Sequence, residues 1–285
     1  MGSNPPVRIS FISALHNCLP LTKAMLESLE ATVDLSDKEV VLIDDASSDG
    51  TSDYIDTLKE RENFRLLNNS ENQGFAISNN RAAESASGEI LVFINNDLEF
   101  SPDWLAPVVT ALENEPQAGA VGNVQRNFKS GLVDHAGIYF DLEGLPTHAH
   151  KNRANPPRGK IIERNAATAA CLAIRKETFA EIGGFDTSYR NGCEDVDLCM
   201  KLKSRGYRIY VALDSVIRHH ISVSPGRNLH NDNNTKIFRE RWSAFAKPFG
   251  EQEWAREYFR RYARFWWRIN PSLACKALSR LIFPT

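Results

Sequence analysis

The stretch VVLIDDASSDGT, residues 40–51, is an apolar run that ends in two acids and a polar turn. Its first four residues are β-branched or aliphatic, which predicts a buried strand. Asp44 and Asp45 then stand at the carboxyl end of that strand, where open α/β sheets bind their ligands. Ser47, Asp49 and Thr51 have the residue types that satisfy a turn and a helix start. We therefore expect the two acids to accept hydrogen bonds from the ribose or base of a nucleotide.

Two other interpretations of this stretch are weaker. Asp45, Ser47, Asp49, Gly50 and Asp56 nearly match the ligand spacing of an EF-hand calcium loop. An EF-hand needs a helix before its loop, however, and the preceding residues form a strand pattern. A dinucleotide-binding domain would place an acid similarly, but no GxGxxG follows the first predicted strand.

On both sides of this stretch, short apolar runs alternate with helical patterns between residue 7 and about residue 125. This alternation predicts βαβ units around a mostly parallel sheet, and hence an α/β domain. Ser101, Pro102 and Asp103 provide an N-cap, a first-turn proline and an acid, which predict a helix start at that point. The predicted strands are residues 8–14, 39–43, 64–67, 90–94 and 118–124.

Composition excludes several classes of protein. The chain has 285 residues, 42% hydrophobic and 25% charged, and a net charge of −2, so it offers no overall basic field for nucleic acid. Its five cysteines form no CxxC pair, which disfavours disulfide and zinc frameworks and favours a reducing cytoplasm. Residues 1–6 are expected to be an unstructured cloning remnant. The apolar run that follows them is too short for the core of a signal peptide, so none is expected. Since no apolar run reaches the ~20 residues of a membrane span, any membrane contact should be peripheral.

Three further clusters could carry chemistry, although each also has a structural interpretation, as a turn, a helix cap and a structural histidine pair respectively. Asn95, Asn96 and Asp97 follow a predicted buried strand, and the Asp97 carboxylate could share Mg²⁺ or Mn²⁺ with substrate phosphates. The helix expected over residues 194–205 opens with Glu194, Asp195 and Asp197, three acids in four residues, which exceeds what capping needs and offers a general base. His219 and His220 end a short predicted strand, where an imidazole could complete an oxygen-rich metal site.

Two regions are less regular. Residues 127–165 receive no element assignment, and His148 and His150 within them are interpreted as a solvated loop rather than a metal site. The last fifty residues interleave aromatic and basic side chains, a pattern typical of helices at a membrane interface and also of helices that pack on a domain. Their members include Trp242, Phe245, Trp254, Tyr258, Phe259, Tyr262, Phe265, Trp266 and Trp267, with Arg256, Arg260, Arg261, Arg264 and Arg268.

The order of these motifs resembles the family 2 glycosyltransferases, inverting enzymes of the GT-A fold, and more narrowly their rhamnosyltransferase-like members. The similarity extends from Ser10–Asn17 through the residue 44–51 motif, Asn72-x-Gly74-Phe75-Ala76, Asn95–Asp97, Gly183–Asp186 and Glu194–Leu198 to His219. It implies that Asp195 is the catalytic base, that Asp97 and His219 bind Mn²⁺ or Mg²⁺, with His220 as the alternative ligand, and that Glu194 and Asp197 lie on the acceptor side. The donor-binding residues that it implies are Ala14, Leu15, Asn17, Asp44, Asp45, Ser47, Asn72, Gly74, Asn79, Asn95 and Asn96.

The resemblance also implies an organisation and partners. Residues 7–225 would form a Rossmann-like GT-A catalytic domain, with a nucleotide-sugar half (7–125) and an acceptor half (126–225), followed by a helical extension (226–285). The donor would be a UDP- or dTDP-sugar, with dTDP-rhamnose a candidate, and the acceptor a glycan or polyprenyl-linked glycan. Peripheral contact with the cytoplasmic membrane face would come through the extension, in bacterial surface polysaccharide synthesis. Because Asn95 and Asn96 stand where many relatives carry an acid, a degenerate nucleotide-sugar-binding scaffold is the alternative.

Overall fold

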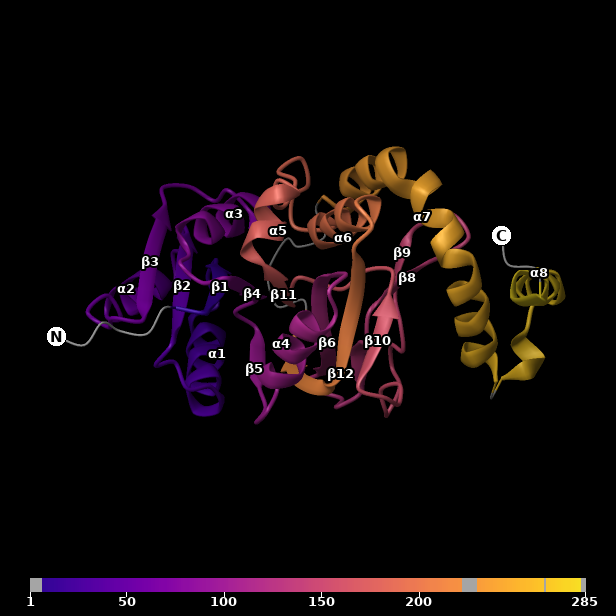
Figure 1. Ribbon diagram of the computed structural model, residues 1–285, viewed down its shortest axis with the longest axis horizontal. Coiled ribbons are helices and arrows are strands. Elements are labelled where there is room, and N and C mark those ends of the chain that lie inside the picture. The colour runs from indigo at the N-terminus through magenta and orange to yellow at the C-terminus, as the bar shows by residue number, and fades with distance from the viewer. Residues whose placement is uncertain (1–6, 222–229, 264, 283–285) are drawn as a thin grey trace.

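A mixed ten-stranded sheet forms the centre of the molecule in the computed structural model, which describes residues 7–221, 230–263 and 265–282 (Figure 1). Its main path runs β10-β12-β6-β11-β4-β1-β2-β3, with β5 beside β12 and β7 beside β6. The strands are β1 (Ile9–Leu15), β2 (Lys38–Asp45), β3 (Phe64–Asn69), β4 (Ile90–Ile94), β5 (Leu98–Phe100), β6 (Ala118–Asn127), β7 (Val133–His135), β10 (Ile161–Arg164), β11 (Cys171–Arg175) and β12 (Arg208–His219). A separate pair joins β8 (Ile138–Phe140) to β9 (Pro146–His148).

Strand direction sets which chain segments meet. β1 is parallel to β2 and β4, β2 is parallel to β3, and β6 is parallel to β12. β11 runs antiparallel to both β4 and β6, so β4 and β6 point the same way. The carboxyl ends of β1, β2, β4 and β12 therefore lie along one edge of the sheet, together with the start of β11.

Helices cover both faces of the sheet because its strands are apolar on both sides. On β1, Phe11 belongs to the core cluster under α1 (Leu19–Thr32) and α4 (Leu105–Asn114). The next residue, Ile12, belongs to the cluster under the opposite helices, as the alternation of side chains along a strand requires. Those helices include α3 (Phe75–Ser85), α5 (Lys176–Glu181) and α6 (Glu194–Ser204), while the short α2 (Thr51–Asp56) follows β2.

The α/β architecture and the five strands expected before residue 125 are confirmed, but the helix start at Ser101 is wrong. The helix begins at Leu105, and Asp103 adopts a left-handed φ of 61° in a turn before it. The reason is Trp104, which stacks on Phe100 with ring centroids 4.4 Å apart and also contacts Phe11. Packing of this buried ring fixes the chain locally and overrides the capping signal.

The irregular region and the fourth motif also differ from expectation. Residues 127–165 contain the short strands β7 to β10 rather than loops alone. The strand that ends at His219 is twelve residues long and begins at Arg208, well before the predicted run. Register shifts interrupt its pairing with β6 between Ala212 and Val216, which explains why the sequence pattern looks like a shorter strand.

The C-terminal helix α7 (Asn231–Tyr262) packs against the sheet domain over its first half. Phe238 and Ala246 are fully buried in the same core cluster as α6. At Gly250 a Cβ atom would lie 2.4 Å from the carbonyl oxygen of Phe140, so the close approach to β8 requires glycine. The predicted boundary at residue 225 and the residue 1–6 remnant lie outside the described residues.

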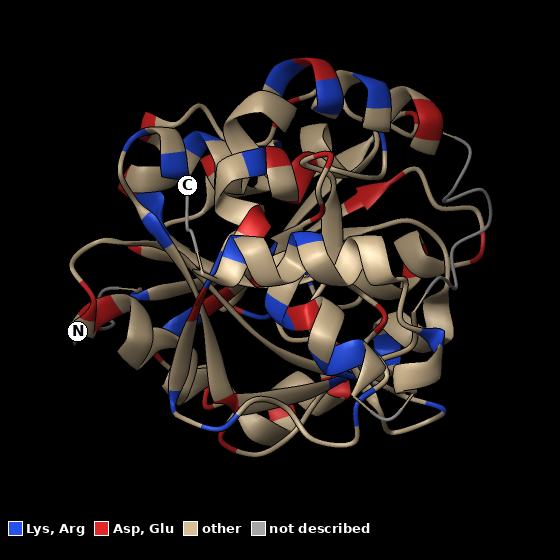
Figure 2. Cartoon of the chain, turned by 90° about the vertical axis from the view of Figure 1, so that its right-hand side faces the viewer, with Lys and Arg blue, Asp and Glu red and all other residues tan. Residues whose placement is uncertain are grey.

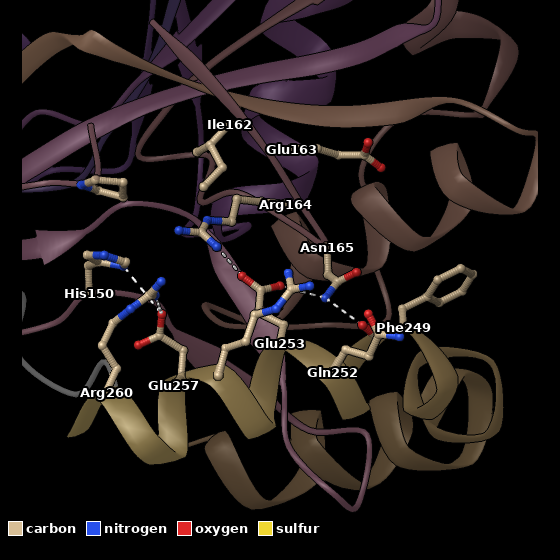
Figure 3. Close-up of a pocket in the computed structure, with 12 residues that line it drawn as sticks. His150, Ile162, Glu163, Arg164, Asn165, Phe249, Gln252, Glu253, Glu257 and Arg260 are labelled. Atoms are coloured by element: carbon tan, nitrogen blue, oxygen red, sulfur yellow. Dashed lines mark hydrogen bonds and ion pairs between the residues drawn. The ribbon is translucent and has the colours of Figure 1, made fainter. Parts of the chain in front are cut away.

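Ion pairs fasten the middle of α7 to β10 around a cavity of about 380 Å³ (Figure 3). Arg164 pairs with Glu253, and Asn165 Nδ2 donates to Glu253 Oε2 at 2.9 Å. His150 Nδ1 lies 3.5 Å from Glu257 Oε1. Burial, opposed by Glu257 and assisted by Arg164, lowers the pKa of His150 to about 4. The interpretation of His150 as a solvated loop residue is therefore wrong, because α7 covers it.

The chain continues into a 3₁₀ turn, η1 (Trp266–Arg268), and α8 (Pro271–Ile282), at one end of the long axis in Figure 1. α8 packs beside the far half of α7, where Tyr258, Ala255 and Ala277 form a small separate core cluster. Within the described ranges, no helix combines the length and apolar character that crossing a bilayer requires.

Candidate active site

The edge formed by the carboxyl ends of β1, β2, β4 and β12 gathers most of the predicted site residues. Ala14 and Leu15 end β1, with Asn17 just beyond it, and Asp44 and Asp45 end β2. Asn95, Asn96 and Asp97 follow β4 directly, and His219 is the last residue of β12. Motifs as far apart as residues 14 and 219 thus meet because parallel strands end at one edge.

Asp45 is a buried anchor for the loop that precedes α3. Its Oδ1 accepts hydrogen bonds from Asn69 Nδ2 at 2.6 Å and from the Gln73 amide at 2.8 Å, and its Oδ2 accepts from the Gly74 amide at 2.9 Å. Gly74 has a φ of 84°, which glycine adopts without strain. Asp45 therefore shapes the loop before α3. Among the described residues, the Asp44 carboxylate accepts only two long hydrogen bonds, both from the Ser47 amide at 3.3 Å.

The loops that follow β1 and β2 are bonded to each other. The Asn17 amide donates to Ser47 Oγ at 2.8 Å, and Asn17 Oδ1 accepts from the Ser48 amide at 2.8 Å. Asp49 accepts from the Leu19 amide at 2.9 Å and from Thr51 Oγ1 at 2.6 Å, so its two oxygens serve the starts of α1 and α2. The turn and helix-start roles predicted for these residues are confirmed, and a strand, not a helix, precedes the loop.

Asp97 and His219 form the best candidate metal site. His219 Nε2 lies 3.2 Å from Asp97 Oδ1, and neither buried ring nitrogen of His219 has a hydrogen-bond partner among the described residues. A buried imidazole whose ring nitrogens make no hydrogen bond to the described residues, beside a carboxylate, has the residue types and spacing of two metal ligands. No group of three or more His, Cys, Asp or Glu side chains gathers for a metal in the described ranges. Two protein ligands suit an ion whose other ligands are phosphate oxygens and water.

The neighbouring asparagine and histidine have other partners. Asn96 Nδ2 donates to the carbonyl of Asn17 at 3.2 Å and to Thr22 Oγ1 at 3.1 Å, which ties the motif to α1. His220 points away from Asp97: its Nε2 lies 2.9 Å from Glu99 Oε1 and its ring stacks on Phe128 at 4.0 Å. Of the two histidines, only His219 is placed to join Asp97.

Asp195, in the first turn of α6, reaches the same edge through the backbone that leads into β11. Its Oδ2 accepts from the Ala169 amide at 3.2 Å, and the adjacent Ala170 carbonyl accepts from the Asn95 amide at 2.9 Å. A half-buried carboxylate so placed can take a proton from a bound hydroxyl. Next to it, Glu194 is 4% exposed, and burial raises its pKa to about 7, with the Asp195 charge acting in the same direction.

Three predicted residues are placed differently from the rest. Asn79 lies within α3, and its side-chain Nδ2 donates to the Phe75 carbonyl of the same helix at 2.9 Å. The backbone carbonyl of Asn72 accepts a hydrogen bond from the Arg190 side chain. Asp197 is fully buried and accepts from Trp242 Nε1 of α7 at 2.6 Å. Its side chain therefore faces the C-terminal helix and not an open acceptor side.

Sequence reasoning missed a set of contacts that brace the Asp195 segment. The Asn234 side chain of α7 makes two hydrogen bonds to the backbone of Arg190: its Oδ1 accepts from the Arg190 amide at 3.1 Å, and its Nδ2 donates to the Arg190 carbonyl at 2.8 Å. Asn191 Oδ1 accepts from the Phe75 amide at 3.3 Å, which links that segment to α3. It also missed His135, a fully buried imidazole whose Nε2 accepts from the Thr168 amide at 3.4 Å. A local sequence pattern cannot predict such contacts, because their partners are distant in sequence.

The fold is the GT-A fold of glycosyltransferases. The structure is similar to GalNAc-T7 crystallised with UDP, GalNAc and Mn²⁺ (TM-score 0.64, 17% identity, 76% of this chain and 44% of that one). It is also similar to the mannosyltransferase PcManGT of Pyrobaculum calidifontis in complex with GDP-Man and Mn²⁺ (TM-score 0.58, 21% identity, 98% and 80% covered).

The chain belongs to glycosyl transferase family 2, whose model matches residues 10–183. It is 30% identical over 230 residues to the O-antigen biosynthesis protein RfbC of Myxococcus xanthus, covering 76% of this chain and 18% of that protein. It is 25% identical over 215 residues to an N-acetylglucosaminyl-diphospho-decaprenol L-rhamnosyltransferase of Mycobacterium tuberculosis, covering 66% and 68%. The chain spans less than a third of RfbC and of the Sinorhizobium fredii protein y4gI, to which it is 28% identical. These relatives agree with a rhamnosyltransferase-like member of the family.

Proposed function

We propose that the chain transfers a sugar from a nucleoside-diphosphate sugar to an acceptor hydroxyl, with inversion at the anomeric carbon. The observation that carries this proposal is the backbone link between Asp195 and Asn95, which puts a candidate base at the same sheet edge as Asp97 and His219. A base and a phosphate-binding site at one sheet edge suit a single in-line displacement.

In this displacement Asp195 accepts the acceptor proton while the acceptor oxygen bonds to the anomeric carbon. The bond from that carbon to the diphosphate oxygen breaks in the same step, and the electron pair leaves with the diphosphate. Mn²⁺ or Mg²⁺ held by Asp97 and His219 would supply positive charge that stabilises the leaving diphosphate. Asn96, through its bonds to the Asn17 carbonyl and Thr22, holds the metal-site loop against the donor side.

The donor would lie over the ends of β1, β2 and β4. Asp44, whose hydrogen bonds are long, is the better candidate to contact ribose or base, while Asp45 and Gly74 shape the loop beside it. Ala14, Leu15, Asn17, Ser47, Asn72, Asn79 and Asn95 would complete this donor side. We propose a UDP- or dTDP-sugar, and dTDP-rhamnose in particular, because of the rhamnosyltransferase relative.

The same relative supports a glycan or polyprenyl-linked glycan as acceptor, in bacterial surface polysaccharide synthesis. Such an acceptor would be used at the cytoplasmic face of the inner membrane. Residues 128–164 and Glu194 would form the acceptor wall.

The decisive variant is Asp195→Asn, compared with Asp56→Asn on the exposed end of α2. Loss of the base should lower transfer by about 10²–10⁴-fold and leave donor binding unchanged, whereas Asp56→Asn should behave as wild type. Normal turnover by Asp195→Asn would reject the assigned base.

Donor identity can be tested by thermal shift with UDP-, dTDP- and GDP-sugars, each with and without Mn²⁺. A ligand that binds the native state raises its apparent stability, so a metal-dependent shift with one nucleotide class should name the donor. Donor binding without any hydrolysis or transfer would instead favour the non-catalytic scaffold.

A further inference from the structure

Exposed apolar side chains concentrate at the C-terminal end of the molecule. Among the described residues, six of the eight exposed large hydrophobic side chains lie between residues 265 and 282. Trp266 and Trp267 are 72% and 62% exposed. The other four are Phe265, Leu278, Leu281 and Ile282, and we call these six residues the terminal apolar face. A cluster of this kind marks an interaction surface, because scattered single residues would need no explanation.

This face is held in place and is not simply a frayed end. Tyr258 Oη of α7 accepts from the Asn270 amide at 3.0 Å and donates to the Asn270 carbonyl at 3.1 Å. Arg280 lies 3.0 Å from Glu251, and Ala277 is buried against α7. These contacts fix one side of α8, so the rows that carry Leu278 and Ile282 face away from α7.

The segment that carries the face is basic, although Arg260 and Arg280 pair with Glu257 and Glu251 of α7. From residue 258 to the end, the sequence has six Lys and Arg and no Asp or Glu, although the whole chain has a net charge of −2. In Figure 2, which looks at this end of the molecule, α8 shows basic and uncharged residues only. Arg268 lies over the Phe265 ring, 5.5 Å from its centroid, and so places a cation within the face itself.

We propose that the terminal apolar face docks on an anionic lipid bilayer. Exposed tryptophans suit the interfacial zone, leucine and isoleucine on one side of a short helix suit the upper acyl region, and the surrounding cations suit anionic headgroups. A second copy of the chain would bring like charges together, which disfavours that occupant. The inference deepens the proposed function, on which it rests for its biological purpose: α7 would hold the catalytic domain beside a surface that carries lipid-linked acceptors.

The test is co-sedimentation of the full chain with phosphatidylcholine vesicles, with and without phosphatidylglycerol. We expect binding to the anionic vesicles that weakens as salt rises, and a loss of about tenfold or more in the Trp266→Ser/Trp267→Ser variant. Phe249→Ser removes another exposed aromatic ring, 42% exposed and outside the face, and should bind as wild type. Replacing Arg268 and Lys276 with Gln should reduce binding to anionic vesicles only.

Several results would overturn the inference: no binding of the wild type to anionic vesicles, equal binding of the tryptophan variant, or self-association that this variant abolishes. The last result would make the face an interface between copies. Because all these side chains are exposed, their variants should keep the wild-type melting temperature, which is measured in parallel. Donor hydrolysis separates the two proposals: failed vesicle binding with normal hydrolysis rejects only the membrane contact, and normal turnover by Asp195→Asn rejects only the assigned mechanism.

Discussion

Asp197→Asn tests whether two acids only two positions apart have different roles. Asp197 is fully buried, and its Oδ1 accepts from Trp242 Nε1 at 2.6 Å, Arg241 at 3.0 Å and Tyr189 Oη at 3.2 Å. Lys201 Nζ lies 3.1 Å from Oδ2, at ion-pair distance. The carboxylate thus joins α6 to α7. Asparagine preserves its shape but removes the charge and turns an amide toward Lys201.

The expected cost follows from burial. Breaking a fully buried ion pair costs about 3–5 kcal/mol, but the Arg241 side chain is 37% exposed and the Lys201 side chain 18%, so water compensates part of the loss. We expect a decrease of about 2–3 kcal/mol in the free energy of unfolding. With an unfolding entropy of about 2 cal/mol/K per residue, that decrease lowers the melting temperature by roughly 4 °C.

The assay pairs thermal unfolding with turnover measured well below the melting temperature. Asp197→Asn should have a lower melting temperature and retain most of its kcat. Asp195→Asn should keep the wild-type melting temperature and lose turnover. An unchanged melting temperature for Asp197→Asn would refute the structural role. Lost turnover without a change in melting temperature would return Asp197 to the acceptor side, where the family resemblance places it.

Three other predictions concern the site. His219→Ala should abolish the Mn²⁺-dependent part of donor binding in calorimetry, and His220→Ala should leave it intact; the reverse result would exchange the two histidines. Because burial raises the pKa of Glu194 from 4.5 to about 7, the native state binds the extra proton between these values, and stability should fall by ~3 kcal/mol as pH rises across them. Urea unfolding of Glu194→Gln from pH 4.5 to 8 should show a flatter profile, and an equal slope would contradict the assignment. Asp45→Ala, which strips three donors of their acceptor, should destabilise the fold by about 2–4 kcal/mol in the same measurement.

The central fold was predictable because its signals are local. Doubly buried strands such as Ile90–Ile94 are continuous apolar runs, and their ends carry the turn chemistry that the structure confirms around Asp49. The prediction failed where distant packing competes with local preference. The packing of Trp104 on Phe100 shifts the start of α4 from the predicted Ser101 to Leu105. The burial of His150 depends on α7, about a hundred residues later in the chain, so the local sequence around His150 does not predict it.

The candidate site was predictable to a similar extent. Parallel strand ends explain why Asp44 and Asp97 lie along one edge, and strand direction alone would have suggested it. The choice between His219 and His220 needed the pairing of β12 with β5, which sets His219 opposite Leu98 and so beside Asp97. A one-residue change of register would have exchanged them, and the sequence pattern does not fix that register.

The opposite roles of Asp195 and Asp197 follow from the helix that carries them. Residues two apart on an α-helix project about 200° from each other, so one of these acids had to point away from the site if the other faced it. Asp197 shares a side with Lys201, four residues on, and the structure shows that this side meets α7. The helical period therefore separates the two acids in the sequence itself, but only the Ala169 contact shows which of them faces the sheet edge. Two of the three acids in this turn thus serve different neighbours: Asp195 faces the sheet edge, and Asp197 faces the helix that leads to the terminal apolar face.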